Sequence, residues 1–253
     1  MELELIHYVI LFGVSLLAGF VDSIAGGGGI IAIPALLALG IPPHLALGTN
    51  KLGGSFGSFT AAYNFYKKGL LKLNEVWLGV VFTFIGAVIG TTTVLFIDAT
   101  ILKKAIPFML VFLFFYFLFL PKLGEVDREK RVSKKVFYIC FGLLLGFYDG
   151  FFGPGTGTFW MVAIVVLLGL NLKSATAQTK AMNFTSNIVS LGVFVFNGQV
   201  LFLLGIVMGI GQVLGAIIGS NMVVKRDVKF IRVMFLCVVG ATILKLFYDN
   251  FMH

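Results

Sequence analysis

The sequence predicts an all-α integral membrane protein that forms a single transmembrane domain from two repeats. Hydrophobic residues make up 59% of its 253 residues and charged residues only 12%, with a mean hydropathy of +1.04, whereas soluble domains carry roughly a quarter charged residues. Several apolar runs, such as Ala105 to Leu120, approach the roughly 20 residues that span a bilayer. A glycine-rich stretch with an aspartate also occurs twice, at corresponding places in the two halves.

The two glycine-rich stretches run from Gly19 to Gly29 (GFVDSIAGGGG) and from Gly146 to Gly157 (GFYDGFFGPGTG). Glycine costs about 1 kcal/mol per residue in a helix interior, and a central aspartate costs about 2.5 to 3.5 kcal/mol on membrane-insertion scales. Irregular backbone survives in a membrane only where it lines a cavity or is buried in protein. We therefore expect both stretches to be non-helical and to face each other near the middle of the membrane.

Five apolar segments follow one another in the first half. The first begins after the acidic start Met-Glu-Leu-Glu, unlike a cleaved signal peptide, whose start is basic. The second has only 12 residues, about 18 Å of helix, which is short of the roughly 30 Å hydrocarbon core. The third contains an intramembrane lysine, and the fourth contains a Gly-x-x-x-Gly motif that favours close packing. Their predicted bounds are Leu5–Phe20, Ile30–Ile41, Leu45–Tyr66, Val76–Ile97 and Ile101–Leu120.

The second half repeats this plan, again with a short second segment and a lysine in the third. Its predicted segments are Val136–Phe147, Phe159–Leu170, Ala175–Phe196, Val200–Val224 and Phe230–Phe247. Chemically unusual residues match between the halves at an offset of 127 to 129 positions: Asp22 with Asp149, Lys51 with Lys180, Gly69 with Gly198, Asp98 with Asp227, and Gly86-x-x-x-Gly90 with Gly215-x-x-x-Gly219. We place repeat one at 1–121, a cytoplasmic linker at 122–135 and repeat two at 136–253. Internal repeats are typical of secondary transporters.

The distribution of Lys and Arg predicts the orientation in the membrane. If the first two segments of each half start and finish on the same side, nearly all the basic residues fall on one side, and only Lys103 and Lys104 fall on the other. The positive-inside rule makes the basic side cytoplasmic and places both termini outside. Each half then makes an odd number of crossings, so the repeats are inverted, and such repeats hold their binding site at their interface.

The starts of the two short helices, near Gly27 and Gly155, are candidates for an anion site. The first N–H groups of a helix lack intrahelical partners and carry partial positive charge, and glycine lets an oxyanion approach them closely. The alternative is that glycine serves tight helix packing. The predicted backbone contacts are Gly26, Gly27, Gly28, Gly29, Gly153, Gly155 and Thr156.

Lys51 and Lys180 lie about a turn and a half into the third segment of their repeats. Facing a cavity, each could hold a substrate oxyanion as a point charge; alternatively, each pairs with an aspartate as a structural element or snorkels to the interface. Neighbouring side chains add hydrogen-bond donors, although polar residues in membrane helices often only join helices. These predicted substrate contacts are Thr49, Asn50, Thr179, Asn183 and Asn187.

Asp22 and Asp149 have two interpretations that can hold together. An intramembrane carboxylate is a candidate for binding a coupled proton, and an aspartate just before a helix start is also a capping residue.

Other functional classes are disfavoured. The formal charge of +8 sits at the ends of apolar runs, so no nucleic-acid surface is predicted. Cys140 and Cys237 lie singly in apolar stretches and predict no metal site. We see no catalytic residues, no phosphate-binding Gly-x-x-x-x-Gly-Lys loop and no cofactor motif, so we predict that the protein is not an enzyme and needs no cofactor. The expected partners are a small anion, the lipid bilayer and a coupling ion such as a proton, and the oligomeric state is left open.

At these residues the chain resembles the TauE/SafE sulfite exporter family, also described as the four-toluene-sulfonate uptake permease family. The resemblance covers nearly the whole chain. It rests on the stretches Asp22–Gly29, Gly48–Lys51 and Gly146–Gly157, on Pro34 and Gly40, and on Thr179, Lys180 and Asn183. It implies a multi-pass carrier in the inner membrane that moves sulfite, sulfonates or related small organic anions by alternating access, coupled to an ion gradient. The alternatives are an anion channel and a transporter of another small solute.

Overall fold

The computed structural model describes residues 4–118 and 129–225, and this part of the chain is helical without a strand. The first half contains α1 (Leu5–Ala25), α2 (Gly28–Ala38), α3 (Pro43–Lys67), α4 (Leu73–Leu95) and α5 (Ala99–Leu118). The second contains α6 (Lys134–Phe151), α7 (Thr156–Ala163) with a π-helical continuation (Ile164–Leu168), α8 (Leu172–Phe196) and α9 (Phe202–Lys225). The all-α prediction is confirmed. The predicted segment Phe230–Phe247, together with Asp227 and Cys237, lies outside the described residues.

The glycine-rich breaks are narrower than the sequence predicts. α1 continues through Asp22 to Ala25, and the chain leaves the helix only at Gly26 and Gly27. α6 continues through Asp149 to Phe151. The prediction that the backbone is irregular from Gly19 and from Gly146 onward was therefore wrong.

Close packing explains why these glycines are helical. A Cβ atom on Gly19 would lie 2.4 Å from the main-chain oxygen of Gln212 in α9, and one on Gly146 would lie 2.6 Å from that of Thr83 in α4. At both places the absence of a side chain lets two backbones approach, and the packing gained outweighs the low helix propensity of glycine.

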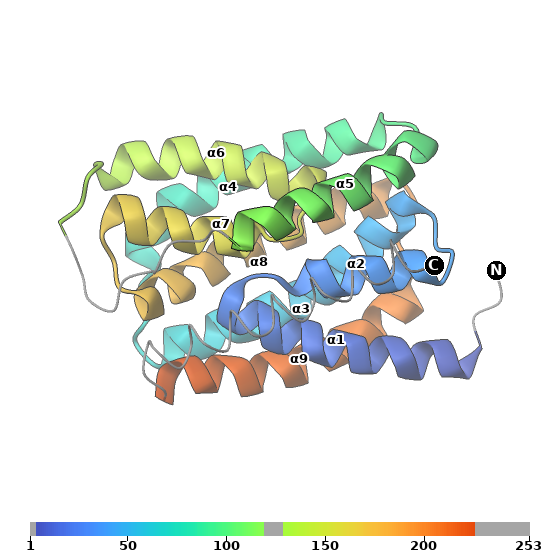
Figure 1. Ribbon diagram of the computed structural model, residues 1–253. Helices are drawn as coiled ribbons and strands as arrows, with labels where there is room; N and C mark the ends of the chain where they lie inside the picture. Colours follow the sequence, from blue (N-terminus) through green and yellow to red (C-terminus); the bar gives the residue numbers. More distant parts are fainter. Residues whose placement is uncertain (1–3, 119–128, 226–253) are drawn as a thin grey trace.

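The helices form a bundle in which the outer pairs each join one helix from either half. α4 lies beside α6 along one side, α1 lies beside α9 along the other, and α2, α3, α7 and α8 lie between them (Figure 1). A Cβ atom on Gly90 would lie 2.0 Å from the oxygen of Phe147, and one on Gly215 would lie 2.0 Å from that of Leu16. The predicted close-packing role of these two Gly-x-x-x-Gly motifs is confirmed.

The apolar helices surround a polar centre. Within the described residues, α1, α4 and α9 are long and apolar enough to cross a membrane. α2 has 11 residues, about 16 Å of helix, so the short second segment of the first half is confirmed. The inner helices α3 and α8, with 25 residues each, bury most of the polar side chains that the sequence singles out. Every predicted site residue lies on these two helices, at the two breaks or in the helix turns that flank the breaks.

Candidate functional site

The two breaks are in direct contact. A Cβ atom on Gly26 would lie 2.4 Å from the Cα atom of Gly157, and the hydroxyl of Thr158 donates a hydrogen bond of 2.7 Å to the main-chain oxygen of Ala25. Gly26 has a φ of 78°, a conformation that favours glycine. The starts of α2 and α7 are therefore brought together by backbone contact between the halves.

Two buried ion pairs cross between the halves beside this contact. The ammonium group of Lys51 in α3 donates to the carboxylate of Asp149 in α6 at 2.7 Å and to its main-chain oxygen at 2.6 Å. The ammonium group of Lys180 in α8 donates to the carboxylate of Asp22 in α1 at 2.9 Å and also to its main-chain oxygen. Each lysine thus pairs with the aspartate of the other half, so the lysine–aspartate pairing that one of the interpretations predicts is present.

The pairs are placed where a cation is favoured. Both aspartates lie in the last turns of their helices, where the main-chain oxygens carry partial negative charge. The Lys180 side chain is 0% exposed and that of Lys51 is 2% exposed, against 6% for Asp149 and 18% for Asp22. Ser186 adds a hydrogen bond from its hydroxyl to Asp149. Burying these charged groups without such partners would cost folding free energy.

A glycine gives Lys51 its path to Asp149. A Cβ atom on Gly153 would lie 3.2 Å from the Lys51 nitrogen and 3.1 Å from the Asp149 carboxylate, and its φ of 95° also favours glycine. The second break therefore serves the ion pair as well as the start of α7.

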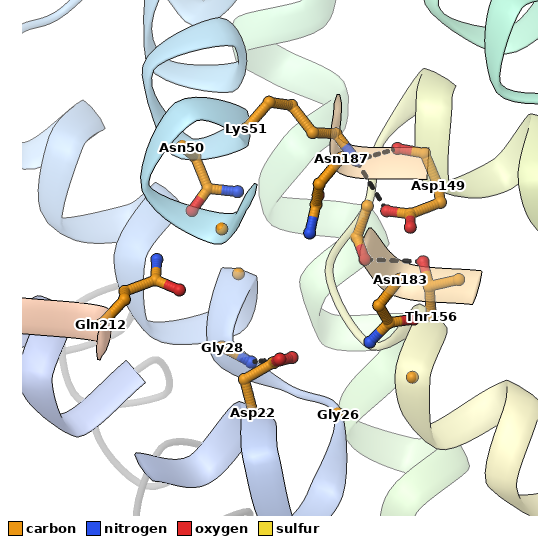
Figure 2. Close-up of a pocket in the computed structure, with 14 residues that line it drawn as sticks. Asp22, Gly26, Gly28, Asn50, Lys51, Asp149, Thr156, Asn183, Asn187 and Gln212 are labelled. Atoms are coloured by element: carbon orange, nitrogen blue, oxygen red, sulfur yellow. Dashed lines mark hydrogen bonds and ion pairs between the residues drawn. The ribbon is translucent and has the colours of Figure 1, made fainter. Parts of the chain in front are cut away.

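A small polar cavity lies between the breaks and the inner helices (Figure 2). Its volume of about 30 Å³ is enough for one or two water molecules. Predicted site residues that line it are Asp22, Gly26, Gly28, Gly29, Asn50, Lys51, Asp149, Gly153, Thr156, Asn183 and Asn187; Gly54, Gly157 and Gln212 line it as well.

Five predicted site residues do not line the cavity: Gly27, Thr49, Gly155, Thr179 and Lys180. Gly27 and Gly155 are the capping residues of α2 and α7. The Thr49 hydroxyl accepts a hydrogen bond of 3.0 Å from the N–H of Leu201. The Thr179 hydroxyl is buried without a hydrogen-bond partner in the part of the chain that the structure describes.

Asp22 also lies at the start of α2. Its carboxylate accepts from the N–H of Gly28 at 3.5 Å (Figure 2), a long hydrogen bond. The capping interpretation of Asp22 therefore has a geometric basis in addition to the pairing with Lys180. For Asp149 the partners of the carboxylate within the described residues are Lys51 and Ser186.

Gln212 is the polar side chain of the cavity that sequence reasoning missed. It lies in the middle of α9, is 3% exposed and belongs to the cavity lining. The available signal was a carboxamide in the middle of an apolar segment, three residues before Gly215. It was overlooked because no polar residue matches it in kind at the corresponding place of the first half, where Thr83 stands.

The chain is similar to a known protein family and to proteins described as membrane transporters. Residues 11–246 match the family model described as "Sulfite exporter TauE/SafE". A "Probable membrane transporter protein" of Haemophilus influenzae is 45% identical over 254 residues, covering 99% of this chain and 98% of that protein. The "Probable membrane transporter protein YfcA" of Escherichia coli K12 is 44% identical, covering 95% and 90% respectively. The "Probable membrane transporter protein YdhB" of Bacillus subtilis is 26% identical over 84% of the chain. No solved structure matches the chain significantly.

Proposed function

The chain belongs to the TauE/SafE family and is a membrane transporter, and from that premise we propose that it is a secondary carrier of a small anion. The substrate class is sulfite, a sulfonate or a related sulfur-containing or organic anion. The carrier works by alternating access in the inner membrane with both termini outside. Its two halves are inverted repeats, and the cavity at their interface is the transport site.

The observation that carries this proposal is the meeting of two helix starts at one cavity. Gly28 and Gly29 of α2 and Gly157 of α7 all line it, and the first N–H groups of each helix lack intrahelical acceptors. Glycine exposes these groups, and the helix dipoles favour negative charge there. Carboxamides of Asn50 and Asn183 add donors from the inner helices. The anion is held by these neutral donors together with Lys51.

Charge balance supports coupling to a cation. Lys51, Lys180, Asp22 and Asp149 form two ion pairs, so their formal charges cancel. An anion that joins them leaves one uncompensated negative charge in a nearly dry site, which is costly. A proton taken up by Asp22 or Asp149 removes that charge, and protonation of Asp149 also frees Lys51, which lines the cavity, to pair with the anion. The proposal thus makes proton and anion bind together.

The crossed pairs also suggest how access alternates. Each pair ties an inner helix of one half to a broken helix of the other, and a cavity of about 30 Å³ is too small for a sulfonate. The halves therefore have to move relative to each other to admit a substrate. In this scheme Lys180, which pairs with Asp22 and does not line the cavity, acts on the site by holding that carboxylate.

Uptake into liposomes tests the proposal. The purified protein is reconstituted and supplied with labelled sulfite, thiosulfate, sulfate or a sulfonate, with and without an imposed pH gradient. Saturable uptake that the gradient accelerates and that shows counterflow supports a coupled carrier. Flux far above carrier rates without counterflow means an anion channel, and no saturable uptake of these anions withdraws the assignment to sulfur-containing anions.

A further inference from the structure

Gln212 places in the cavity a carboxamide that has no hydrogen-bond partner among the described residues. The residue is 3% exposed, and no hydrogen bond to its amide exists within residues 4–118 and 129–225. A buried amide that lacks partners is costly, and nearly all buried polar groups in folded proteins have one. In Figure 2 the amide reaches the cavity from the side opposite Asp149, toward Asn50 and Gly28. The contents of the cavity are therefore its natural partner.

A notch of two glycines in α3 makes room for this side chain. A Cβ atom on Gly57 would lie 2.6 Å from Oε1 of Gln212, and one on Gly53 would lie 3.2 Å from its Nε2. From sequence, Gly53-x-x-x-Gly57 resembles a packing motif between apolar helices. In the structure it is the space through which a polar side chain of α9 reaches the site.

The other half has no equivalent of this arrangement. At the offset of 129, Met182 and Ser186 stand in place of Gly53 and Gly57, and Thr83 stands in place of Gln212. Thr83 does not line the cavity, and the Met182 side chain fills the groove against Gly79, where a Cβ atom would lie 2.5 Å from its Cε. Gln212 is thus a polar contact of the cavity that has no counterpart at the matched position of the first half.

We infer that Gln212 contacts the substrate and selects for anions with three oxygens; this rests on the proposed function. Four carboxamides line the cavity, those of Asn50, Asn183, Asn187 and Gln212. The Asn187 amide donates to the Ser58 hydroxyl, which leaves the amides of Asn50 in α3, Asn183 in α8 and Gln212 in α9 without a hydrogen-bond partner among the described residues. Asn50 Nδ2 lies 3.6 Å from a Cβ position on Gly29, and Asn183 Nδ2 lies 2.8 Å from one on Gly157, so both amides accompany helix starts. Gln212 provides a third donor direction from a separate helix. Sulfite and the sulfonate head group have a third oxygen to receive it, and a carboxylate does not.

Binding to the purified full-length protein tests this inference, with sulfite, methanesulfonate and acetate as probes in isothermal titration calorimetry. Gln212→Leu keeps the volume of the side chain and removes the donor. It should weaken binding of the two sulfur oxyanions about ten- to hundredfold, the usual effect of a lost hydrogen bond to a charged group, and leave acetate binding nearly unchanged. Thr83→Val is the matched control, because it removes a buried hydroxyl at the corresponding place outside the cavity and should change no affinity.

A second variant tests the same contact without changing Gln212. Gly57→Ala should displace the amide and reproduce the loss of selectivity, and the double variant Gly57→Ala/Gln212→Ala should be no worse than Gln212→Ala alone, since both changes act on one contact. Unchanged selectivity in Gln212→Leu, or equal weakening for all three anions, would overturn the role of Gln212 and leave the carrier standing. Absence of any anion binding by the wild-type protein would overturn the proposed function and this inference together.

Discussion

The ammonium group of Lys51 lies 2.7 Å from the carboxylate of Asp149, and the matching Lys180 lies 2.9 Å from that of Asp22. Each pair joins α3 or α8 to the last turns of a broken helix from the other half. Relative movement of the halves therefore acts on both pairs at once. In each half the lysine and the aspartate therefore pair with residues of the other half and not with each other.

Removing one partner of the buried Lys51–Asp149 pair should destabilise the protein strongly. Asp149→Asn leaves an uncompensated ammonium group on a side chain that is 2% exposed, and the expected loss in free energy of unfolding is about 3 to 5 kcal/mol. The double variant Lys51→Met/Asp149→Asn removes both charges and should recover most of that loss without recovering anion transport. Chemical denaturation in detergent measures the first effect, and uptake into liposomes measures the second.

An exposed ion pair provides the control for this prediction. The Lys72 and Glu75 side chains lie 3.7 Å apart and are 67% and 32% exposed. Lys72→Ala should therefore change the free energy of unfolding by less than about 1 kcal/mol. An Asp149→Asn variant as stable as the Lys72→Ala variant would contradict the buried-pair account.

Much of the site could be predicted from sequence because its parts are costly in a membrane. Lysines and aspartates at matched places of two apolar halves have few uses other than a shared site, and the helix starts after the breaks lie at Gly28 and Thr156, close to the predicted Gly27 and Gly155. Which aspartate each lysine meets could not be predicted. That choice depends on how the halves pack, and no local pattern encodes it.

Asp22→Asn should uncouple transport from the pH gradient. Asp22 is the more exposed of the two paired aspartates, lines the cavity and accepts from the start of α2, so a proton from the cavity reaches it more directly than it reaches Asp149. An asparagine cannot take up that proton, and acceleration of uptake by a gradient should be lost. Liposome uptake normalised to the reconstituted protein measures it. Glu75→Gln, outside the cavity, should stay coupled, and a coupled Asp22→Asn variant would remove Asp22 from the mechanism.

Alanine in place of the glycines at the α4–α6 and α1–α9 contacts should destabilise the protein. The added methyl group would lie 2.0 Å from the oxygen of Phe147 in Gly90→Ala and 2.0 Å from that of Leu16 in Gly215→Ala, so the helices must separate, at a cost of about 1 to 3 kcal/mol. Gly192 in α8 has no atom of the described residues within 4 Å of its Cβ position, and Gly192→Ala should be neutral or stabilise by about 0.5 to 1 kcal/mol. Thermal unfolding in detergent separates the two cases. Equal melting temperatures for all three variants would contradict the close packing.

The glycines also show where sequence reasoning reaches its limit. Three glycines in apolar segments have three different roles. Gly19 packs against another backbone inside a helix, Gly26 ends a helix with a φ of 78°, and Gly57 leaves room for the side chain of Gln212. Composition predicts that backbone or side chains approach closely at such places. Only the tertiary arrangement decides which neighbour comes close. For this reason the sequence does not predict the position of Gln212, and it predicts longer irregular stretches than the structure has.

A cross-link between the inner helices should stop transport if the halves move against each other. Ser58 in α3 and Asn187 in α8 occupy matched positions, and the Asn187 amide donates to the Ser58 hydroxyl at 3.3 Å, so the two side chains meet across the interface of the halves. The variant Ser58→Cys/Asn187→Cys, with Cys140 and Cys237 replaced by serine, should lose uptake when its cysteines are oxidised and regain it when they are reduced. Comparing the two redox states of one variant cancels any effect of losing Asn187 from the cavity. Equal uptake in both states, with the disulfide verified by mass spectrometry, would contradict alternating access, because a channel with a fixed path needs no movement between α3 and α8.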